Sequence, residues 1–223
     1  MARIIGNVDA TSSLTTTTVT QDSSLTSLYL PFDSDVNDDS ANSNSVTAYN
    51  GAAVSSAQSK FGGNSLLLDG SNDYLNITDH DSLDFGTSEF TIACWVRYTG
   101  TVGTGTGAYT IVRKFAYDGS SQKSYLLRLT DSTTKLNMLY TADGSSNVSI
   151  TGTTTLSAST WYHIAARRDA ASALRLFVNG NPEVGIVAGT IFSSTDPLRV
   201  GGRPDGNTSF AGNIDDLTIY KGT

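Results

Sequence analysis

Acid–base catalysis requires carboxylates or imidazoles at defined separations, and this chain has few residues that supply them. It contains two glutamates, Glu89 and Glu183. A retaining glycosidase places two carboxyl groups about 5 Å apart across the scissile bond. Glu89 stands directly before an apolar run, whereas Glu183 follows Pro182 in a predicted turn, so the two are not alternate residues of one strand. The sequence therefore predicts no glycosidase pair.

The two histidines suggest no catalytic base. His163 lies in the apolar run 161–168 and is predicted to be a structural histidine of the core, while His80 lies in a polar segment and is predicted to be solvated. The sequence has no nucleophile elbow, phosphate-binding loop or dinucleotide-binding fingerprint. We expect a protein that is not an enzyme, with glycoside hydrolysis as a distant alternative.

Aspartates offer a different chemistry, the binding of a metal ion. Asp38-Asp39 and Asp215-Asp216 are adjacent pairs, and neighbouring residues of a strand point to opposite faces. Such pairs suit a metal better than acid–base catalysis. The first pair belongs to a loop over residues 33–39 that is dense in side-chain oxygens. Calcium takes six to eight oxygen ligands without strict geometry.

Composition excludes several classes of protein. The net charge is −7 and no basic patch is visible, which argues against nucleic acid because phosphate binding needs clustered Lys and Arg. The single cysteine, Cys94, lies in an apolar run and is predicted to be a buried small hydrophobe. No segment reaches the roughly 20 apolar residues of a membrane span, and no signal peptide is recognised.

The chain divides into an N-terminal arm, residues 1–27, and one domain, residues 28–223. Between positions 11 and 27, twelve of seventeen residues are Ser or Thr, so this segment has little to bury. Two interpretations stay open: a disordered leader, or an arm that becomes ordered on a partner or a neighbouring subunit.

From residue 28 onward, short runs of aromatic and β-branched residues alternate with turn residues. The strongest run covers 90–98; a tight turn is predicted at 70–72 and a hairpin signal at Asn179-Gly180. Only 16% of residues are charged, and helical periodicity is never sustained. About a dozen strands at this spacing predict an all-β fold of two antiparallel sheets packed face to face.

Six segments stand out along the chain: LYLPFD at 28–33, KFGGNSLLLDGSNDYL at 60–75, FTIACWV at 90–96, WYHIAA at 161–166, LRLFVNG at 174–180 and GNIDDLTIY at 212–220. Taken in this order, they resemble the laminin-G-like branch of the concanavalin A-like lectins and glucanases. The resemblance covers about residues 28–221. It implies a jelly-roll β-sandwich whose first and last strands lie side by side, in a family of mostly binding or structural modules.

The resemblance also implies a calcium site. Many relatives hold one structural Ca²⁺ that joins the early acidic loop to the last strand. On this basis we predict Asp39 and Asp215 as side-chain ligands, with Asp38 as a further one. The alternative is that these are solvated acids of an acidic protein.

In such sandwiches, sugars bind to loops that carry an aromatic side chain beside Asp and Asn. Two loops fit this description: Tyr117 with Asp118, and the segment that contains Arg203, Asp205 and Asn207. The alternative is that Tyr117 packs over a strand end and that the second segment is simply a tight turn.

Two functions follow. The first is a structural and binding protein of a virion, such as a phage capsid decoration or fibre domain, with a candidate glycan-binding surface. Its partners would be other virion proteins or its own subunits, held by the arm. The second is a lectin-like adhesin domain that binds cell-surface glycans. Neither involves nucleic acid or a membrane, and both place the protein on a virion or an extracellular surface.

Overall fold

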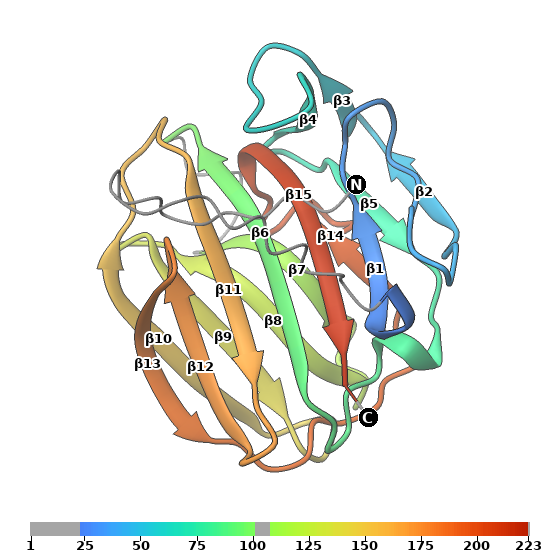
Figure 1. Ribbon diagram of the computed structural model, residues 1–223, viewed down its shortest axis with the longest axis vertical. Helices are drawn as coiled ribbons and strands as arrows, with labels where there is room; N and C mark the ends of the chain where they lie inside the picture. The colour runs from blue at the N-terminus through green and yellow to red at the C-terminus, as the bar shows by residue number, and fades with distance from the viewer. Residues whose placement is uncertain (1–22, 101–107, 223) are drawn as a thin grey trace, which may run out of the picture.

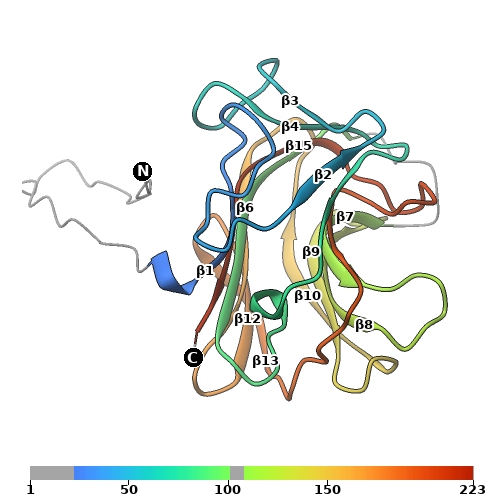
Figure 2. The ribbon, with the colours of Figure 1, turned by 90° about the vertical axis from the view of Figure 1, so that its right-hand side faces the viewer.

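The alternating runs form antiparallel strands that pack as two layers (Figures 1 and 2). This computed structural model describes residues 23–100 and 108–222. Within them lie two short 3₁₀ helices, η1 (Ser23–Leu25) and η2 (Asp81–Leu83), and no helix long and apolar enough to cross a membrane. The strands are β1 (Thr26–Leu30), β2 (Val46–Tyr49), β3 (Ala53–Ser55), β4 (Ser65–Asp69), β5 (Tyr74–Ile77), β6 (Phe90–Tyr98), β7 (Ala108–Phe115), β8 (Lys123–Thr130), β9 (Lys135–Thr141), β10 (Asn147–Thr155), β11 (Tyr162–Arg168), β12 (Ala173–Val178), β13 (Asn181–Val187), β14 (Leu198–Val200) and β15 (Ala211–Lys221).

Sheet A has eight strands in the order β13-β12-β11-β6-β15-β4-β3, with β1 also paired to β15. Sheet B has seven, in the order β10-β9-β8-β7-β14-β5-β2. The first and last strands of the domain lie side by side, with Leu30 opposite Leu217. The expected sandwich of two antiparallel sheets is confirmed. The first strand begins at Thr26, two residues before the predicted boundary, and Thr26 and Ser27 are buried.

The core lies between the sheets and follows the two-residue period of the strands. In β6, Phe90, Ile92, Cys94 and Val96 all point into it, because alternate residues of a strand share one face. Cys94 is fully buried, as predicted, and burial raises the pKa of its thiol. The intervening β6 residue Trp95 faces outward.

Three local predictions differ from the structure. Glu183 and Pro182 lie in strand β13 rather than in a turn; β13 is the edge strand of sheet A, where a proline is tolerated. The turn at 70–72 does not close a hairpin, because β4 belongs to sheet A and β5 to sheet B. His163 pairs with Trp95 on the outer face of sheet A and is half-buried there, so it is not a core residue.

Candidate functional site

The two loops proposed from the sequence as sugar-binding meet on the outer face of sheet B. The loop after β7 carries Tyr117, and the loop after β14 carries Arg203. Both loops project from sheet B away from sheet A (Figure 2). The guanidinium of Arg203 lies 5.0 Å from the centroid of the Tyr117 ring, within the range of a cation–π contact. Sheet topology has therefore joined residues far apart in the chain.

Two further arginines, which the sequence analysis missed, complete this site. Arg199 lies 5.6 Å and Arg113 lies 5.8 Å from the centroid of the same ring. Arg199 stands between Leu198 and Val200, which both point into the core, so its own side chain faces outward. Arg113 is its direct partner on the neighbouring strand. We call Arg113, Arg199 and Arg203 the arginine cluster.

The pattern Leu-Arg-Val at 198–200 is a signal that could have revealed an outward-facing arginine. It could not have shown which side chains lie opposite.

Two of the three guanidiniums have a carboxylate partner. Arg199 contacts Asp196 at 2.8 Å, and Arg203 contacts Asp205 at 2.5 Å. Arg113 donates instead to the backbone carbonyl of Phe115 and has no ion pair among the described residues. The cluster therefore holds one more cation than it has ion-paired carboxylates, and the exposed carboxylate of Asp118 acts on Arg199 from the rim without a described ion pair.

The guanidinium for which no ion pair is described, that of Arg113, is buried. Arg113 is 3% exposed, and burial together with the nearby charges of Arg203 and Arg199 lowers the pKa of its guanidinium to about 10. The Nε–H groups of Arg199 and Arg203 are buried and have no acceptor within the described part of the chain. Desolvated donors without acceptors are unfavourable, and ionisable groups with a perturbed pKa, such as Arg113, are frequent at functional sites.

Asp205 and Asn207 hold the second loop in shape. The backbone and side-chain amides of Asn207 both donate to the Asp205 carboxylate, at 3.1 Å each. Burial raises the pKa of Asp205, but these hydrogen bonds and the Arg203 charge outweigh it and lower that pKa. Asp118 is exposed beside Tyr117, and its carboxylate accepts from the amide of Ser120. The structure thus gathers Tyr117, Arg203, Asp205 and Asn207 in one place, with Asp118 on its rim.

A second aromatic pair lies on the same face of sheet B. Tyr49 and Tyr74, from β2 and β5, stack with their ring centroids 4.8 Å apart. Tyr49 is 42% exposed and Tyr117 is 38% exposed. Burial raises the pKa of Tyr74, with smaller effects from Tyr49, Arg199 and Tyr117, which places this pair close to the arginine cluster.

Among the described residues, the three aspartates predicted to bind calcium do not by themselves form a group of acidic side chains that could hold a metal. The carboxylate of Asp38 already accepts five hydrogen bonds, from Tyr29, Ser40 and Asn44, that hold the loop after β1. Asp39 is exposed. Within residues 23–100 and 108–222, no group of three or more His, Cys, Asp or Glu side chains could hold a metal. Backbone and amide oxygens also bind calcium, so the calcium site stays a prediction.

Asp215 differs from the other two, because one of its oxygens lacks a partner. Oδ2 accepts from the amides of Lys60 and Phe61, at 2.7 and 3.0 Å. Oδ1 is buried with no hydrogen-bond donor in the described region. Burial raises the pKa of Asp215 to about 6, against the lowering effect of those two amides. A bulge follows in β15, so the expected alternation between residues 215 and 216 is broken.

The two glutamates are far apart. Glu89 directly precedes β6, while Glu183 lies on β13, three strands away in sheet A. At about 4.8 Å per strand this is a separation of roughly 14 Å, much more than a retaining pair allows. The Glu183 carboxylate accepts four hydrogen bonds from Thr153 and Thr154 of β10, so it links the edges of the two sheets.

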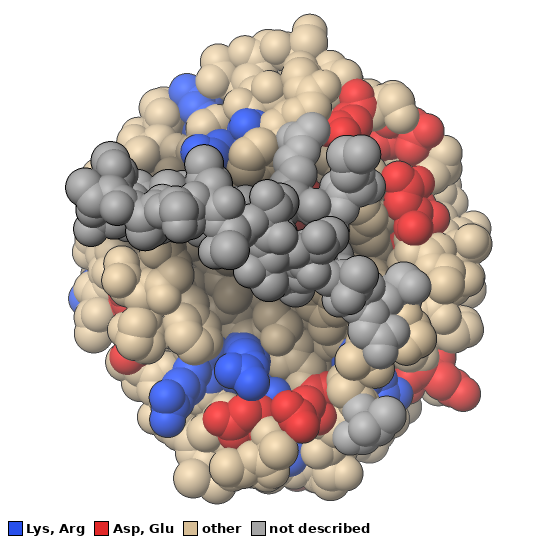
Figure 3. Space-filling view, viewed as in Figure 1, with Lys and Arg blue, Asp and Glu red and all other residues tan. Residues whose placement is uncertain are grey.

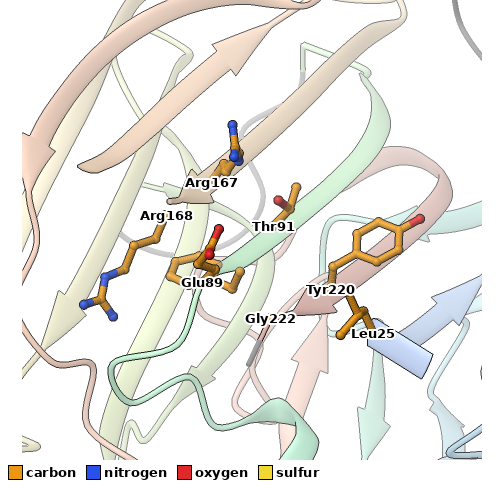
Figure 4. A pocket seen from close by; sticks show the side chains of 8 residues that line it. Leu25, Glu89, Thr91, Arg167, Arg168, Tyr220 and Gly222 are labelled. Carbon is orange, nitrogen blue, oxygen red and sulfur yellow. The ribbon is translucent and has the colours of Figure 1, made fainter. Parts of the chain in front are cut away.

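A shallow hollow of about 220 Å³ lies elsewhere, at one end of sheet A (Figure 4). Glu89, Tyr220 and Arg168 line it, and the Arg168 guanidinium is already bonded to the carbonyls of Gly86 and Ser88. On this face of the molecule, basic and acidic side chains lie beside one another at the lower end (Figure 3). The hollow contains none of the predicted site residues, so the arginine cluster with Tyr117 is the stronger candidate.

Comparisons with known proteins concern the fold. A laminin-G-type family model, described as the concanavalin A-like lectin/glucanases superfamily, matches residues 69–223. No curated protein matches the chain significantly.

Solved structures resemble the chain at low sequence identity. The binding domain of a paraclostridial mosquitocidal protein aligns with 17% identity and a TM-score of 0.69, over 91% of this chain and 50% of that one. The ligand-binding domain of botulinum neurotoxin serotype D, in complex with N-acetylneuraminic acid, aligns with 13% identity and a TM-score of 0.66, over 90% of this chain and 48% of that one. A botulinum neurotoxin type C structure, described by its cell entry through two ganglioside molecules, aligns with 15% identity and a TM-score of 0.66, over 89% and 48%. The chain spans about half the length of these structures.

Proposed function

This chain belongs to the concanavalin A-like lectin/glucanases superfamily, and from that premise we propose that it is a non-catalytic module that binds carbohydrate on the outer face of sheet B. One observation carries the proposal: an exposed tyrosine ring stands on a loop with three arginines and an Asp–Asn pair around it. Binding sites combine apolar or aromatic surface with a few converging polar groups. A sugar ring presents both an apolar face and hydroxyl groups to such a surface.

Two of the similar solved structures support carbohydrate binding as a role for this fold. One holds N-acetylneuraminic acid and another is described by its interaction with gangliosides. Their identity to this chain is 13% and 15%, so the support extends to the fold and not to particular residues.

The separation of the glutamates supports a role without catalysis. Their distance across sheet A and the hydrogen bonds that occupy Glu183 favour binding over hydrolysis. Reducing-sugar release from a panel of β-glucans would contradict this part of the proposal.

The test is a glycan array probed with the wild-type chain and with Tyr117→Ala. We expect wild-type binding to a defined group of glycans, and a loss of about tenfold or more in Tyr117→Ala, because truncation removes the exposed ring. Tyr220→Ala is the matched control, since Tyr220 lies on the outer face of the other sheet. Absence of wild-type binding, or equal binding by both variants, would contradict the site.

We also propose, as a second role, attachment of the module to a virion through its N-terminal arm. Residues 1–22 of this arm lie outside the described residues, so the virion and extracellular locations stay predictions from the sequence. What supports the role is the place of β1, which among the described strands pairs only with β15, at the N-terminal end of sheet A's part of the chain. Light scattering on the full chain and on a chain that begins at Ser23 tests it. Equal mass and equal particle binding would contradict the role of the arm.

A further inference from the structure

We propose that the arginine cluster makes the carbohydrate site selective for saccharides that carry an anionic group, a carboxylate or a sulfate. The inference rests on the proposed function and specifies the class of glycan. It begins from the charge count, in which three guanidiniums surround one ring while two carboxylates form ion pairs with them.

The burial of the cluster makes this excess meaningful. A surplus charge on a solvated surface is ordinary, but Arg113 is 3% exposed and Arg199 is 7% exposed. Like charges that are close together and desolvated oppose folding. An anion that entered the site would relieve that repulsion, against the cost of its own desolvation.

Hydrogen-bonding capacity indicates which chemical group would fit the cluster. The Nε–H groups of Arg199 and Arg203 are buried and lack acceptors among the described residues. Guanidinium donors form a rigid fork that matches carboxylate and other oxyanions in bidentate geometry. A neutral sugar hydroxyl can accept hydrogen bonds but carries no charge, whereas an oxyanion accepts from the guanidinium fork and also neutralises its charge. The geometry therefore favours an acidic saccharide over a neutral one.

Access to the cluster differs among its members. Arg203 is the most exposed, with 23% of its side chain accessible, while Arg199 keeps 9%. Arg113 is more deeply buried than Arg199 and Arg203, so it would attract an anionic group through its charge and not through direct contact. Arg203 is therefore the residue to change first, because its substitution disturbs packing least.

The experiment compares acidic glycans with their neutral parents. Sialyllactose and lactose differ by a carboxylate-bearing sugar, and sulfated galactose and galactose differ by a sulfate. An array with both pairs, glucuronic-acid oligosaccharides and neutral oligosaccharides is probed with wild type, and titration calorimetry then measures the tightest pair. We expect acidic members to bind at least about tenfold more tightly than their parents. The glycan pair with the larger difference in affinity shows whether a carboxylate or a sulfate is preferred.

Variants link that preference to the cluster. Arg203→Gln is expected to weaken binding of the acidic member by about 10- to 100-fold and binding of the neutral parent by much less, so that the ratio of the two affinities falls. Arg203→Lys keeps the charge without the fork and should fall between the two. Arg175→Gln, which removes an exposed arginine from the outer face of sheet A, is the matched control and should change neither.

The outcomes separate the two proposals. Equal affinity for acidic and neutral members, or an acidic preference that Arg203→Gln leaves intact, would overturn this inference while the carbohydrate-binding proposal stands. Absence of binding to every glycan would overturn both. Thermal unfolding of each variant verifies that it is folded before its affinity is compared.

Discussion

Replacing Lys114 with methionine would leave two carboxylates facing a buried site from which their cation has been removed. The side chain of Lys114 is fully buried, and its ammonium lies 2.6 Å from Asp79 and 3.0 Å from Asp84 and donates to the carbonyl of Ser194. Lys114 pairs with the core residue Tyr125, so it points to the interior of the sandwich, opposite to Arg113. These contacts hold the end of β7 from which the Tyr117 loop departs.

The exposure of the partners sets the expected loss of stability. Removal of one partner from a buried ion pair typically lowers the free energy of unfolding by about 3–5 kcal/mol, because the remaining charge stays desolvated. The side chains of Asp79 and Asp84 are 33% and 18% exposed, so water compensates in part. We therefore expect a loss of about 3 kcal/mol for Lys114→Met. Urea unfolding followed by tryptophan fluorescence measures it.

A second substitution and a control make the reasoning refutable. Adding Asp84→Asn to Lys114→Met removes one of the unpaired charges and should restore about 1 kcal/mol. Lys135→Met removes a half-buried lysine with no ion pair in the described part of the chain and should change stability by less than about 0.5 kcal/mol. A loss below about 1 kcal/mol for Lys114→Met, or a double variant no more stable than the single one, would refute the role of Lys114 as a buried counterion.

Glu183 and Asp215 should each make the free energy of unfolding depend on pH. Burial raises the pKa of Glu183, but hydrogen bonds from two threonines outweigh burial and lower that pKa from 4.5 to about 2. The ionised Glu183 therefore stabilises the fold above pH 4.5, and this stabilisation is lost as pH falls through about 2. Glu183→Gln should remove this acid dependence and about 1 kcal/mol of stability near neutral pH, whereas the control Glu89→Gln should not, as urea unfolding at several pH values would show. Burial raises the pKa of Asp215 from 3.8 to about 6, so its contribution is full below pH 3.8 and is lost as pH rises through about 6. Asp215→Asn should abolish this loss, of about 1–3 kcal/mol, while Asp216→Asn should keep it; parallel curves for wild type and Asp215→Asn would contradict the assignment. If Asp39 and Asp215 do share a calcium ion, a chelator should lower the melting temperature and added calcium should restore it, and an unchanged melting temperature would remove the ion.

Strand positions could be predicted because each depends on a short stretch of sequence. The run 90–98 became a strand with those same bounds, since the two-residue period of apolar side chains is read within a few positions. Two strands, β3 and β13, were not predicted from the sequence. β3 is short and largely polar, and β13 contains a proline and a glycine that signal a turn. The pairing of β13 with β12 at the sheet edge overrode that local signal.

The sequence by itself determined the class of fold, the Asn-Gly hairpin and the absence of a paired-glutamate motif, because each follows from residues near one another in the chain. It also identified the two loops of the candidate site separately. Only the tertiary structure decided that Tyr117 and Arg203 meet, that Arg113 and Arg199 lie beneath them, and that Glu183 joins the two sheet edges. These contacts depend on which strands are neighbours, and strand order is set by long-range packing of the two sheets rather than by any local pattern.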